Sequence, residues 1–166
     1  MKQLLLLLAI SVMGITANAA VYFTPSLFYM KYEVEQGSTA ESELSIYNFK
    51  LGMTLASGLY VGGVYDMEAM DDNDRTSYGL GVGYIKDGWN LHFTYFLSSE
   101  RESGSSEYTG TGMNFEIGYL FPLGSWSLGP TLTYRMFTYD EYDDASINPE
   151  RDENRFLPYV TLQFMF

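Results

Sequence analysis

Apolar residues recur at every second position along most of the chain between Val21 and Phe166. This is the period of a β-strand, in which successive side chains point to opposite faces. Eight segments follow the pattern, and none of them carries a convincing helical stripe. The segments span residues 21–35, 44–56, 58–68, 76–86, 89–99, 107–121, 126–139 and 155–166. The pattern therefore predicts an all-β chain of eight strands.

The connections between these segments are alternately long and short. The short ones are Ser57-Gly58, Asp87-Gly88 and residues 122–125, whose residue types are typical of tight turns. The longer polar links span residues 36–43, 69–75, 99–106 and 140–154. An up-and-down antiparallel barrel gives this order when one end has tight turns and the other has open loops. Because the number of strands is even, we expect both chain ends at the tight-turn end.

The two faces of the strands differ in a way that favours a membrane barrel over a soluble lipocalin-like barrel. A soluble barrel points its apolar face inward, whereas a transmembrane barrel points it outward. No charged residue interrupts the apolar faces, although a soluble core would also exclude charge. The opposite face is rich in glycine, which suits the narrow lumen of eight strands. These glycines are Gly52, Gly62, Gly79, Gly81, Gly83, Gly110, Gly112, Gly118 and Gly129. We therefore expect the apolar face to contact lipid.

Aromatic residues gather toward both ends of the apolar faces. Trp89, Trp126, Tyr119, Phe121 and Phe164 lie near the tight-turn end. A second set lies toward the long links and consists of Tyr32, Tyr47, Tyr65, Tyr78, Tyr95 and Tyr134. Two aromatic girdles mark the two interfaces of an outer membrane. Ordinary cross-strand aromatic pairing is the alternative interpretation.

The first residues have the organisation of a secretory signal peptide. A short positive start is followed by the apolar run 4–10, and Ala17-Asn18-Ala19 has the small-x-small pattern of a cleavage site. We expect residues 1–19 to be the signal peptide and residues 20–166 to be the barrel domain. An anchoring membrane helix is the alternative.

The last strand carries a more specific pattern, with apolar residues alternating through Leu162 and Phe164 to a final Phe166. This strand resembles the terminal strand of Gram-negative outer-membrane barrels. Together with the signal peptide, the chain resembles the small eight-stranded barrels of the OmpA and OmpX type, without a periplasmic domain. The resemblance implies an outer-membrane location with both termini in the periplasm. It also implies that Leu162, Phe164 and Phe166 belong to a signal that the barrel-assembly machinery binds.

Charged residues occur on the face that we expect to line the lumen. They are Lys31, Glu33, Lys50, Asp66, Glu116 and Arg135, three of each sign. Buried charges are tolerated when they are paired. Lys50 and Glu116 lie at similar heights above tight turns, on strands that are opposite each other in a ring of eight. We predict that they meet across the lumen, that Arg135 joins from above Glu116, and that the network plugs the barrel.

Composition excludes several function classes. The net charge of −12, from 21 acidic and 9 basic residues, argues against nucleic acid as a partner. The chain has no cysteine, which excludes disulfides and thiolate chemistry. Some similar barrels modify lipid A with a His-x-Ser arrangement, but the single histidine, His92, is followed by Thr94 and is expected in the lumen. We predict no enzyme and no cofactor. A lipid A deacylase or acyltransferase and a narrow solute channel are the alternatives.

Most acidic residues fall in or beside the four long links, where we expect surface loops. Asp71, Asp72 and Asp74 are the strongest metal candidates, but the order of an EF-hand is missing, so no metal is predicted. Divalent bridging to lipopolysaccharide phosphates is the alternative to plain solvation. The predicted role is structural or surface interaction by a monomer. Its predicted partners are membrane lipid, lipopolysaccharide and an unidentified surface ligand.

Overall fold

The computed structural model describes residues 19–35, 39–55, 57–71 and 73–166, with side chains for these residues outside 32–41. The predicted signal peptide therefore lies outside the described residues, apart from Ala19. Nine strands are present: β1 (Ala20–Glu35), β2 (Thr39–Thr54), β3 (Leu59–Met70), β4 (Asn73–Lys86), β5 (Trp89–Ser103), β6 (Ser106–Tyr119), β7 (Phe121–Pro122), β8 (Trp126–Tyr142) and β9 (Ala145–Met165). Among the described residues, no helix is long and apolar enough to cross a membrane.

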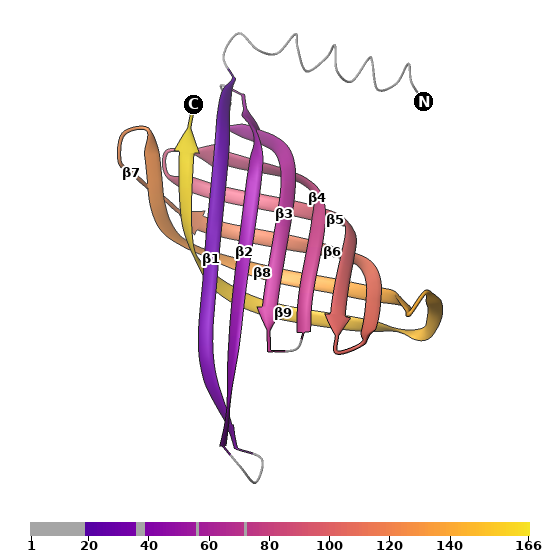
Figure 1. Cartoon of the computed structure of the whole chain (residues 1–166). Coiled ribbons are helices and arrows are strands. Elements are labelled where there is room, and N and C mark those ends of the chain that lie inside the picture. The colour runs from indigo at the N-terminus through magenta and orange to yellow at the C-terminus, as the bar shows by residue number, and fades with distance from the viewer. Residues whose placement is uncertain (1–18, 36–38, 56, 72) are drawn as a thin grey trace, which may run out of the picture.

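Eight of the strands form a closed antiparallel ring (Figure 1). Each of the first five pairs with the next, β6 then pairs with β8, β8 with β9, and β9 with β1. The two-residue β7 pairs only with the start of β8. The predicted fold class, an up-and-down barrel of eight strands, is confirmed.

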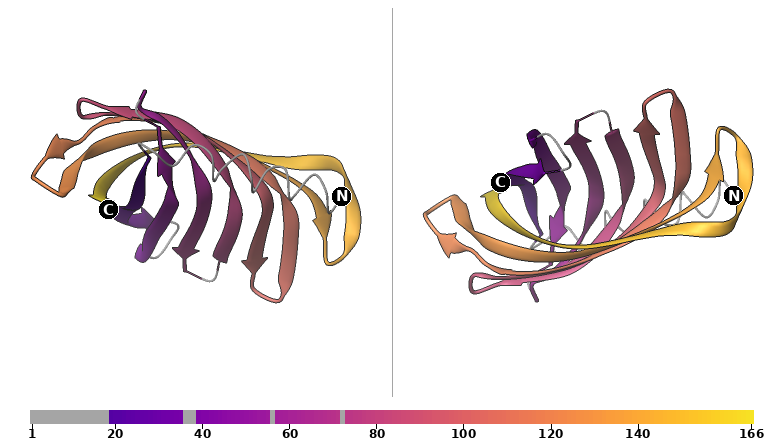
Figure 2. Two further views of the ribbon diagram at one scale, coloured as in Figure 1. Left: turned by 90° about the horizontal axis from the view of Figure 1, so that it is seen from above. Right: turned by 90° about the horizontal axis from the view of Figure 1, so that it is seen from below.

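The strands are longer than the sequence pattern indicated, which corrects the prediction of four long loops. β8 continues to Tyr142 and β9 already begins at Ala145, so the predicted link 140–154 is almost entirely strand. Residues 69–70, 73–75 and 99–103 likewise belong to the ends of paired strands. Polar residues at these positions hide the alternation of apolar residues, but the backbone ladder continues. Figure 2 shows these hairpins projecting from the barrel.

The predicted tight turns are present at the opposite end. Gly58, Gly88 and Gly124 have positive φ angles of 90°, 85° and 86°, and Asp87 has a φ of 53°. Glycine adopts this left-handed region without a steric penalty, whereas most residues do not. Turn chemistry in the sequence therefore sets where the strands reverse.

The distribution of side chains is the reverse of that in a soluble protein. Among the described residues, 21 polar or charged side chains are buried, against 11 hydrophobic ones. Large hydrophobic side chains cover the outside instead, for example Leu80, which is 62% exposed, and Val160, which is 61% exposed. The strands achieve this by strict alternation. In β6, buried Asn114 and Glu116 alternate with exposed Phe115 and Ile117.

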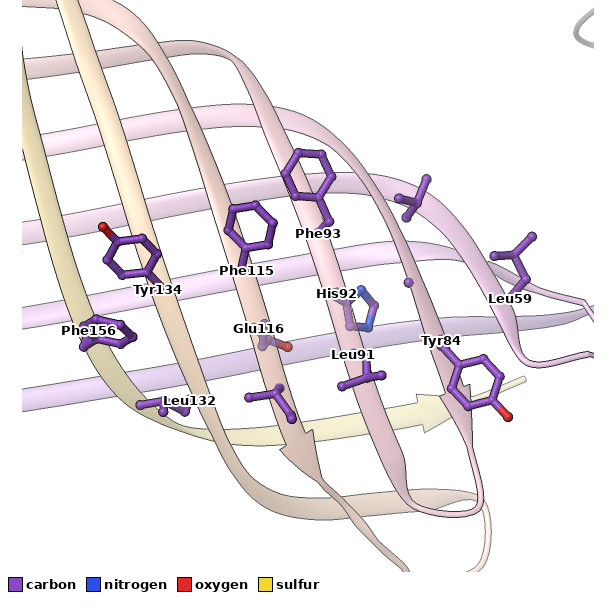
Figure 3. Close-up of a pocket in the computed structure, with 13 residues that line it drawn as sticks. Leu59, Tyr84, Leu91, His92, Phe93, Phe115, Glu116, Leu132, Tyr134 and Phe156 are labelled. Carbon is purple, nitrogen blue, oxygen red and sulfur yellow. The ribbon is translucent and has the colours of Figure 1, made fainter.

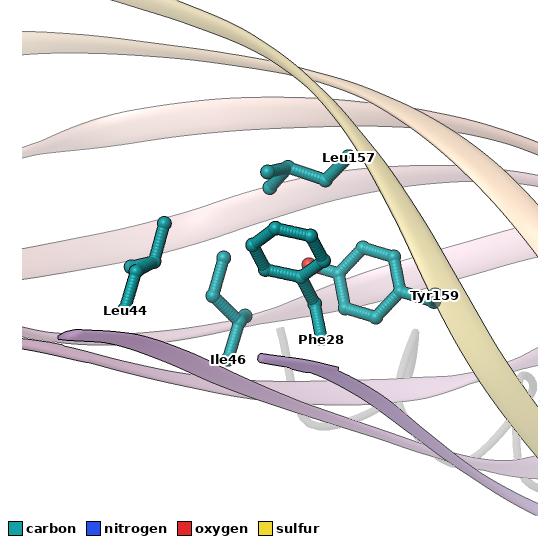
Figure 4. Close-up of a cluster of buried hydrophobic side chains, with 5 residues drawn as sticks. All are labelled: Phe28, Leu44, Ile46, Leu157 and Tyr159. Carbon is teal, nitrogen blue, oxygen red and sulfur yellow. The ribbon is translucent and has the colours of Figure 1, made fainter. Parts of the chain in front are cut away.

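Two small apolar clusters lie inside the barrel among the polar side chains. One consists of Phe28, Leu44, Ile46, Leu157 and Tyr159, from β1, β2 and β9 (Figure 4). The other consists of Val64, Phe96, Phe137 and Tyr139. The lumen is therefore filled by a mixture of apolar contacts and polar groups.

The structure corrects the predicted faces at two places. In β1, the alternation of apolar residues places Phe28 and Met30 on the face expected to contact lipid. Phe28 is instead buried in the lumen, and its ring centroid lies 6.1 Å from that of Tyr159. Thr24 and Ser26 are also buried, so even-numbered residues already point inward earlier in the strand. In β5, an irregularity between Phe96 and Ser99 shifts the register, so Ser99 is buried in place of Ser98.

Gly79 on β4 lies close to the backbone of β5. A Cβ at this position would meet the backbone oxygen of Tyr95 and lie 2.7 Å from Cα of Phe96. The neighbouring backbone cannot move aside as a flexible side chain would. Gly63, on the outer face of β3, has no atom within 4 Å of the same position.

We predict that Gly79→Ala destabilises the barrel by about 1–3 kcal/mol, because it forces the two strands apart. Gly63→Ala is the matched control and changes stability by less than about 0.5 kcal/mol. Urea unfolding of the protein in lipid bilayers measures both values. Equal stabilities of the two variants would contradict the close approach of β4 and β5.

Candidate functional site

The lower part of the lumen contains a buried ion pair between strands on opposite sides of the ring. Lys50 Nζ on β2 lies 2.9 and 3.1 Å from the two carboxylate oxygens of Glu116 on β6. Asn90 and Thr133 also donate hydrogen bonds to Glu116, at 3.0 and 3.4 Å. We call these four residues the lysine cluster. The structure thus brings Lys50 and Glu116 together across the lumen.

His92 lies beside the lysine cluster and is buried. Its Nε2 is 2.9 Å from Oδ1 of Asn90, and its ring packs edge-on against Tyr60 at a centroid distance of 4.7 Å. Within the described residues, neither of its nitrogens is hydrogen-bonded to a serine or threonine hydroxyl. The arrangement fits a packed lumen side chain better than a catalytic base.

A larger network fills the lumen toward the hairpins. Four arginines, from β4, β5, β8 and β9, surround three carboxylates from β3 and β9. We call this the arginine cluster, and it consists of Arg75, Arg101, Arg135, Arg155, Asp66, Glu68 and Glu153. Most of these side chains are buried or nearly so, and Arg155 is the most accessible, at 24% exposure.

Each carboxylate of the arginine cluster has more than one cationic or polar partner. Glu68 pairs with Arg75 and with Arg155, whose Nη1 lies 2.6 Å away. Glu153 accepts a hydrogen bond from Arg101 at 2.8 Å and also pairs with Arg155. Such multiple pairing offsets the cost of removing charges from water.

The arginines also pack against an aromatic ring. The guanidinium carbon of Arg75 lies 3.9 Å from the ring centroid of Phe137, and that of Arg135 lies 5.2 Å away. A cation over a ring face is attracted by the ring quadrupole. Phe137 thus links the charged network to the inner apolar cluster around Val64.

The structure changes the predicted partner of Arg135. We expected it above Glu116, but it pairs with Asp66, donates to the Tyr159 hydroxyl at 3.0 Å and lies 3.6 Å from Glu68. The stagger between strands places it at the height of β3 residues rather than at that of Glu116.

Two other predicted network members are not in the lumen network that the structure describes. Lys31 is 45% exposed and lies 3.8 Å from Glu43. Its side chain faces outward because Phe28 points inward, and residues an odd number of positions away from Phe28 therefore lie on the outer face of this part of β1. The side chain of Glu33 lies outside the described residues.

Sequence reasoning missed five residues of the arginine cluster: Glu68, Arg75, Arg101, Glu153 and Arg155. The signal that was not followed is the alternation of inward and outward positions with a period of two, which continues into the polar links. Arg75 is in phase with buried Ser77 and Gly79, and Glu153 and Arg155 are in phase with buried Leu157. Arg101 could not have been found in this way, because the irregularity in β5 changes the phase before it.

The acidic hairpin ends do not assemble a metal site in the part of the chain that the structure describes. Asp71 instead accepts hydrogen bonds from the Ser42 hydroxyl at 2.5 Å and from the Glu43 backbone at 3.3 Å. Asp74 is exposed on β4, and Asp72 lies outside the described residues.

The outer face carries the predicted aromatic residues of the tight-turn end. Trp89, Tyr119, Phe121 and Trp126 are exposed, and Phe164 is half-buried. Trp89 packs edge-on against Tyr119 at 5.6 Å, so cross-strand pairing is also present.

Above these residues, apolar side chains of six strands border a groove of about 590 Å³ on the outer face. Figure 3 shows Phe93, Phe115, Tyr134 and Phe156 from neighbouring strands along it.

No protein-family model matches the chain, and none of the curated proteins matches it. Among solved structures, Neisserial surface protein A is similar over 90% of this chain and 99% of its own, at 12% identity and a TM-score of 0.51. The translocator domain of the autotransporter NalP from Neisseria meningitidis covers 97% of this chain, which matches 67% of that domain, at 16% identity and a TM-score of 0.40. A structure of the KdgM porin covers 89% of this chain and 99% of its own, at 12% identity and a TM-score of 0.27.

The similarity to Neisserial surface protein A concerns the fold, over almost the whole of both chains. It supports the predicted fold, a small eight-stranded barrel.

We predict that Lys50→Met costs about 3–5 kcal/mol of stability, because it leaves the Glu116 carboxylate buried without its cation. Replacing both residues, with Lys50→Met and Glu116→Leu, costs less than the single change, since no lone charge remains. Urea unfolding in lipid bilayers gives the double-mutant cycle.

The exposed pair of Lys31 and Glu43 provides the control for this cycle. Glu43→Gln is expected to change stability by less than about 1 kcal/mol. A cycle in which the double variant is as destabilised as the sum of the single variants would contradict direct pairing of Lys50 with Glu116.

Proposed function

We propose that this protein is an integral outer-membrane barrel of a Gram-negative bacterium with a structural or surface-interaction role. The observation that carries the proposal is the reversed distribution of side chains, with polar groups inside and large apolar groups outside. A soluble monomer rarely exposes an apolar patch beyond a few hundred Å². A lipid environment makes the same surface favourable.

The strand lengths and ring closure support a transmembrane position. A membrane-crossing β-strand needs about 9–11 residues, and the eight ring strands have 12 to 21. Closure of the ring satisfies the backbone groups that hydrocarbon cannot. Neisserial surface protein A, which shares the fold, is by its name a surface protein.

In the proposed orientation, the tight turns and both chain termini face the periplasm, and the longer hairpins face outward. The β5–β6 and β8–β9 hairpins are joined by hydrogen bonds: the backbone N–H of Glu107 donates to Asp143 Oδ1 at 2.8 Å, and Ser106 and Tyr142 share a hydrogen bond of 2.8 Å. They would present acidic side chains on hairpins that these hydrogen bonds hold in place. This supports a role in surface contact, with a partner still to be identified.

The proposed barrel is closed to general solutes. Arg135, Tyr60, Tyr139 and Lys50 are among its largest fully buried side chains, and they fill the lumen. Water-filled channels are found in barrels of about 16–18 strands. We therefore favour the structural role. A narrow channel and an enzyme that uses the buried His92 are the alternatives.

The proposed partners are the membrane lipid, lipopolysaccharide and, during biogenesis, the barrel-assembly machinery. A monomer suffices, because the ring has no open sheet edge at the level of its closing ladders.

The absence of cysteine from the sequence makes a labelling test of the orientation direct. We predict that Asp144→Cys reacts with a membrane-impermeant maleimide in intact cells, because it lies at the tip of the β8–β9 hairpin. Ser57→Cys, in a tight turn, should react only after the outer membrane is permeabilised. The reverse labelling would refute the proposed orientation, and labelling of neither variant in the membrane fraction would refute the location.

A second prediction separates assembly from stability. Phe166 closes the ring through its backbone, which exchanges hydrogen bonds of 2.9 and 3.2 Å with Val21, while its side chain is 77% exposed. We expect Phe166→Ala to lower the amount of barrel in the outer membrane severalfold. The urea midpoint of the refolded protein should remain unchanged.

Phe156→Ala, on the same strand and 68% exposed, is the matched control and should not reduce assembly. Equal assembly of all three proteins would remove the proposed role of the terminal aromatic residue.

A further inference from the structure

The contact between β1 and β9 is the weakest part of the ring. Their ladder joins Tyr22–Met165, Phe23–Phe164, Ser26–Thr161 and Leu27–Val160. In the part of the chain that the structure describes, no β1–β9 pair follows Leu27, although β1 continues to Glu35. Both strands remain fully paired to their other neighbours. Figure 1 shows β9 beside β1 near the C-terminus and curving away from it further along.

Prolines in both strands explain why this seam is short. The register places Pro25 opposite Leu162, and this pair is missing from the ladder. Continuing the same register places Pro158 opposite Tyr29, two residues beyond the last pair, Leu27–Val160. In β9, Phe166 donates toward β1 and Met165 toward the other side, so even-numbered residues face β1. Pro158 therefore lacks the N–H that the next ladder bond requires.

A cavity of about 460 Å³ lies where the two strands part. Its lining combines the two faces of the barrel wall, since Phe156 is exposed on the outside while Leu44 and Leu157 are buried inside. Met30 and Met70 complete its apolar lining. A volume of this size falls within the range of small-molecule sites, about 300–1,000 Å³.

One charged group borders this apolar cavity. Arg155 lines it and is the most accessible arginine of the arginine cluster. The cluster holds four guanidinium groups and three carboxylates, so it carries one unbalanced positive charge. An apolar cavity beside an accessible guanidinium complements a hydrocarbon chain with an anionic headgroup.

We propose that the open seam between β1 and β9 binds an anionic, phosphate-bearing lipid of the surrounding leaflet. One acyl chain enters the cavity beside Leu44 and Leu157, and the phosphate pairs with Arg155. Phe156 borders both this cavity and the outer apolar groove, which gives the chain a continuous apolar path from the lipid face. This inference rests on the proposed membrane location.

The test measures lipid retention by native mass spectrometry. The folded protein is released from mixed micelles that contain equal amounts of dilauroyl phosphatidic acid and dilauroyl phosphatidylcholine. We expect one molecule of phosphatidic acid to be retained, with a preference of about tenfold over phosphatidylcholine. Equal retention of both lipids, or retention of neither, would overturn the proposal.

Two substitutions separate the headgroup from the chain. Arg155→Gln should reduce the preference to about onefold to twofold. It spares the fold, because Glu68 keeps Arg75 and Arg135, and Glu153 keeps Arg75 and Arg101. Met30→Trp should abolish retention by filling the cavity, and it is tolerated because Met30 is 41% exposed. Unchanged retention in Met30→Trp would place the lipid elsewhere.

Two further variants complete the design. Leu91→Trp makes a similar enlargement at a residue of 38% exposure in the outer groove and should retain lipid like the original protein. Pro158→Val restores a seam-facing N–H and should reduce retention by extending the ladder. Heat-dependent mobility on gels and flotation with vesicles are measured for every variant. A protein that fails to insert contradicts the membrane location, whereas one that inserts without retaining lipid contradicts only the seam site.

Discussion

A β-strand in hydrocarbon must have its backbone groups paired by other strands, because lipid offers no hydrogen-bond partner. This constraint explains why the sheet closes through β6–β8 and β1–β9 instead of ending in free edges. Closing a ring with only eight strands fixes a narrow lumen. The lumen then determines which side chains fit at inward positions. Because every second residue of a strand points inward, the same restriction applies along every strand.

The narrow lumen takes the place of a hydrophobic core. Glycine fits where strands come close, as at Gly79, and larger polar groups fit where they can reach a partner across the ring. Lys50 and Glu116 satisfy each other from opposite strands, and the arginines share carboxylates and the ring of Phe137. Buried charges are costly when single, so the pairing is what makes a charged interior compatible with a stable barrel.

Sequence alone predicted the ring, the outward apolar face and the encounter of Lys50 with Glu116. The period of two assigns a residue to a face, and the order of turns assigns opposite strands. The partner of Arg135 depends on height within the barrel. That height follows from the stagger between strands, which single-strand patterns do not contain.

Phe28 illustrates a different limit of sequence reasoning. An apolar residue in a strand fits either the lipid face or an apolar cluster inside, and here it packs inside with Tyr159. The polar ends of the strands were missed because charged residues of paired hairpins resemble loops in composition. Arg75 and Glu153 belong to such ends, and they are the residues that connect the hairpins to the lumen.

The same backbone constraint bears on the seam between β1 and β9. An unpaired strand edge at membrane depth is costly, since each free N–H lacks a partner in lipid. Pro158 stands at the first position beyond the ladder at which an N–H would face β1, and it has no N–H to leave unpaired. Proline thus interrupts the pairing. It also removes one of the backbone N–H donors that the interruption would leave without a partner. The opening is therefore least costly at Pro158, next to Phe156 and the most accessible guanidinium of the arginine cluster.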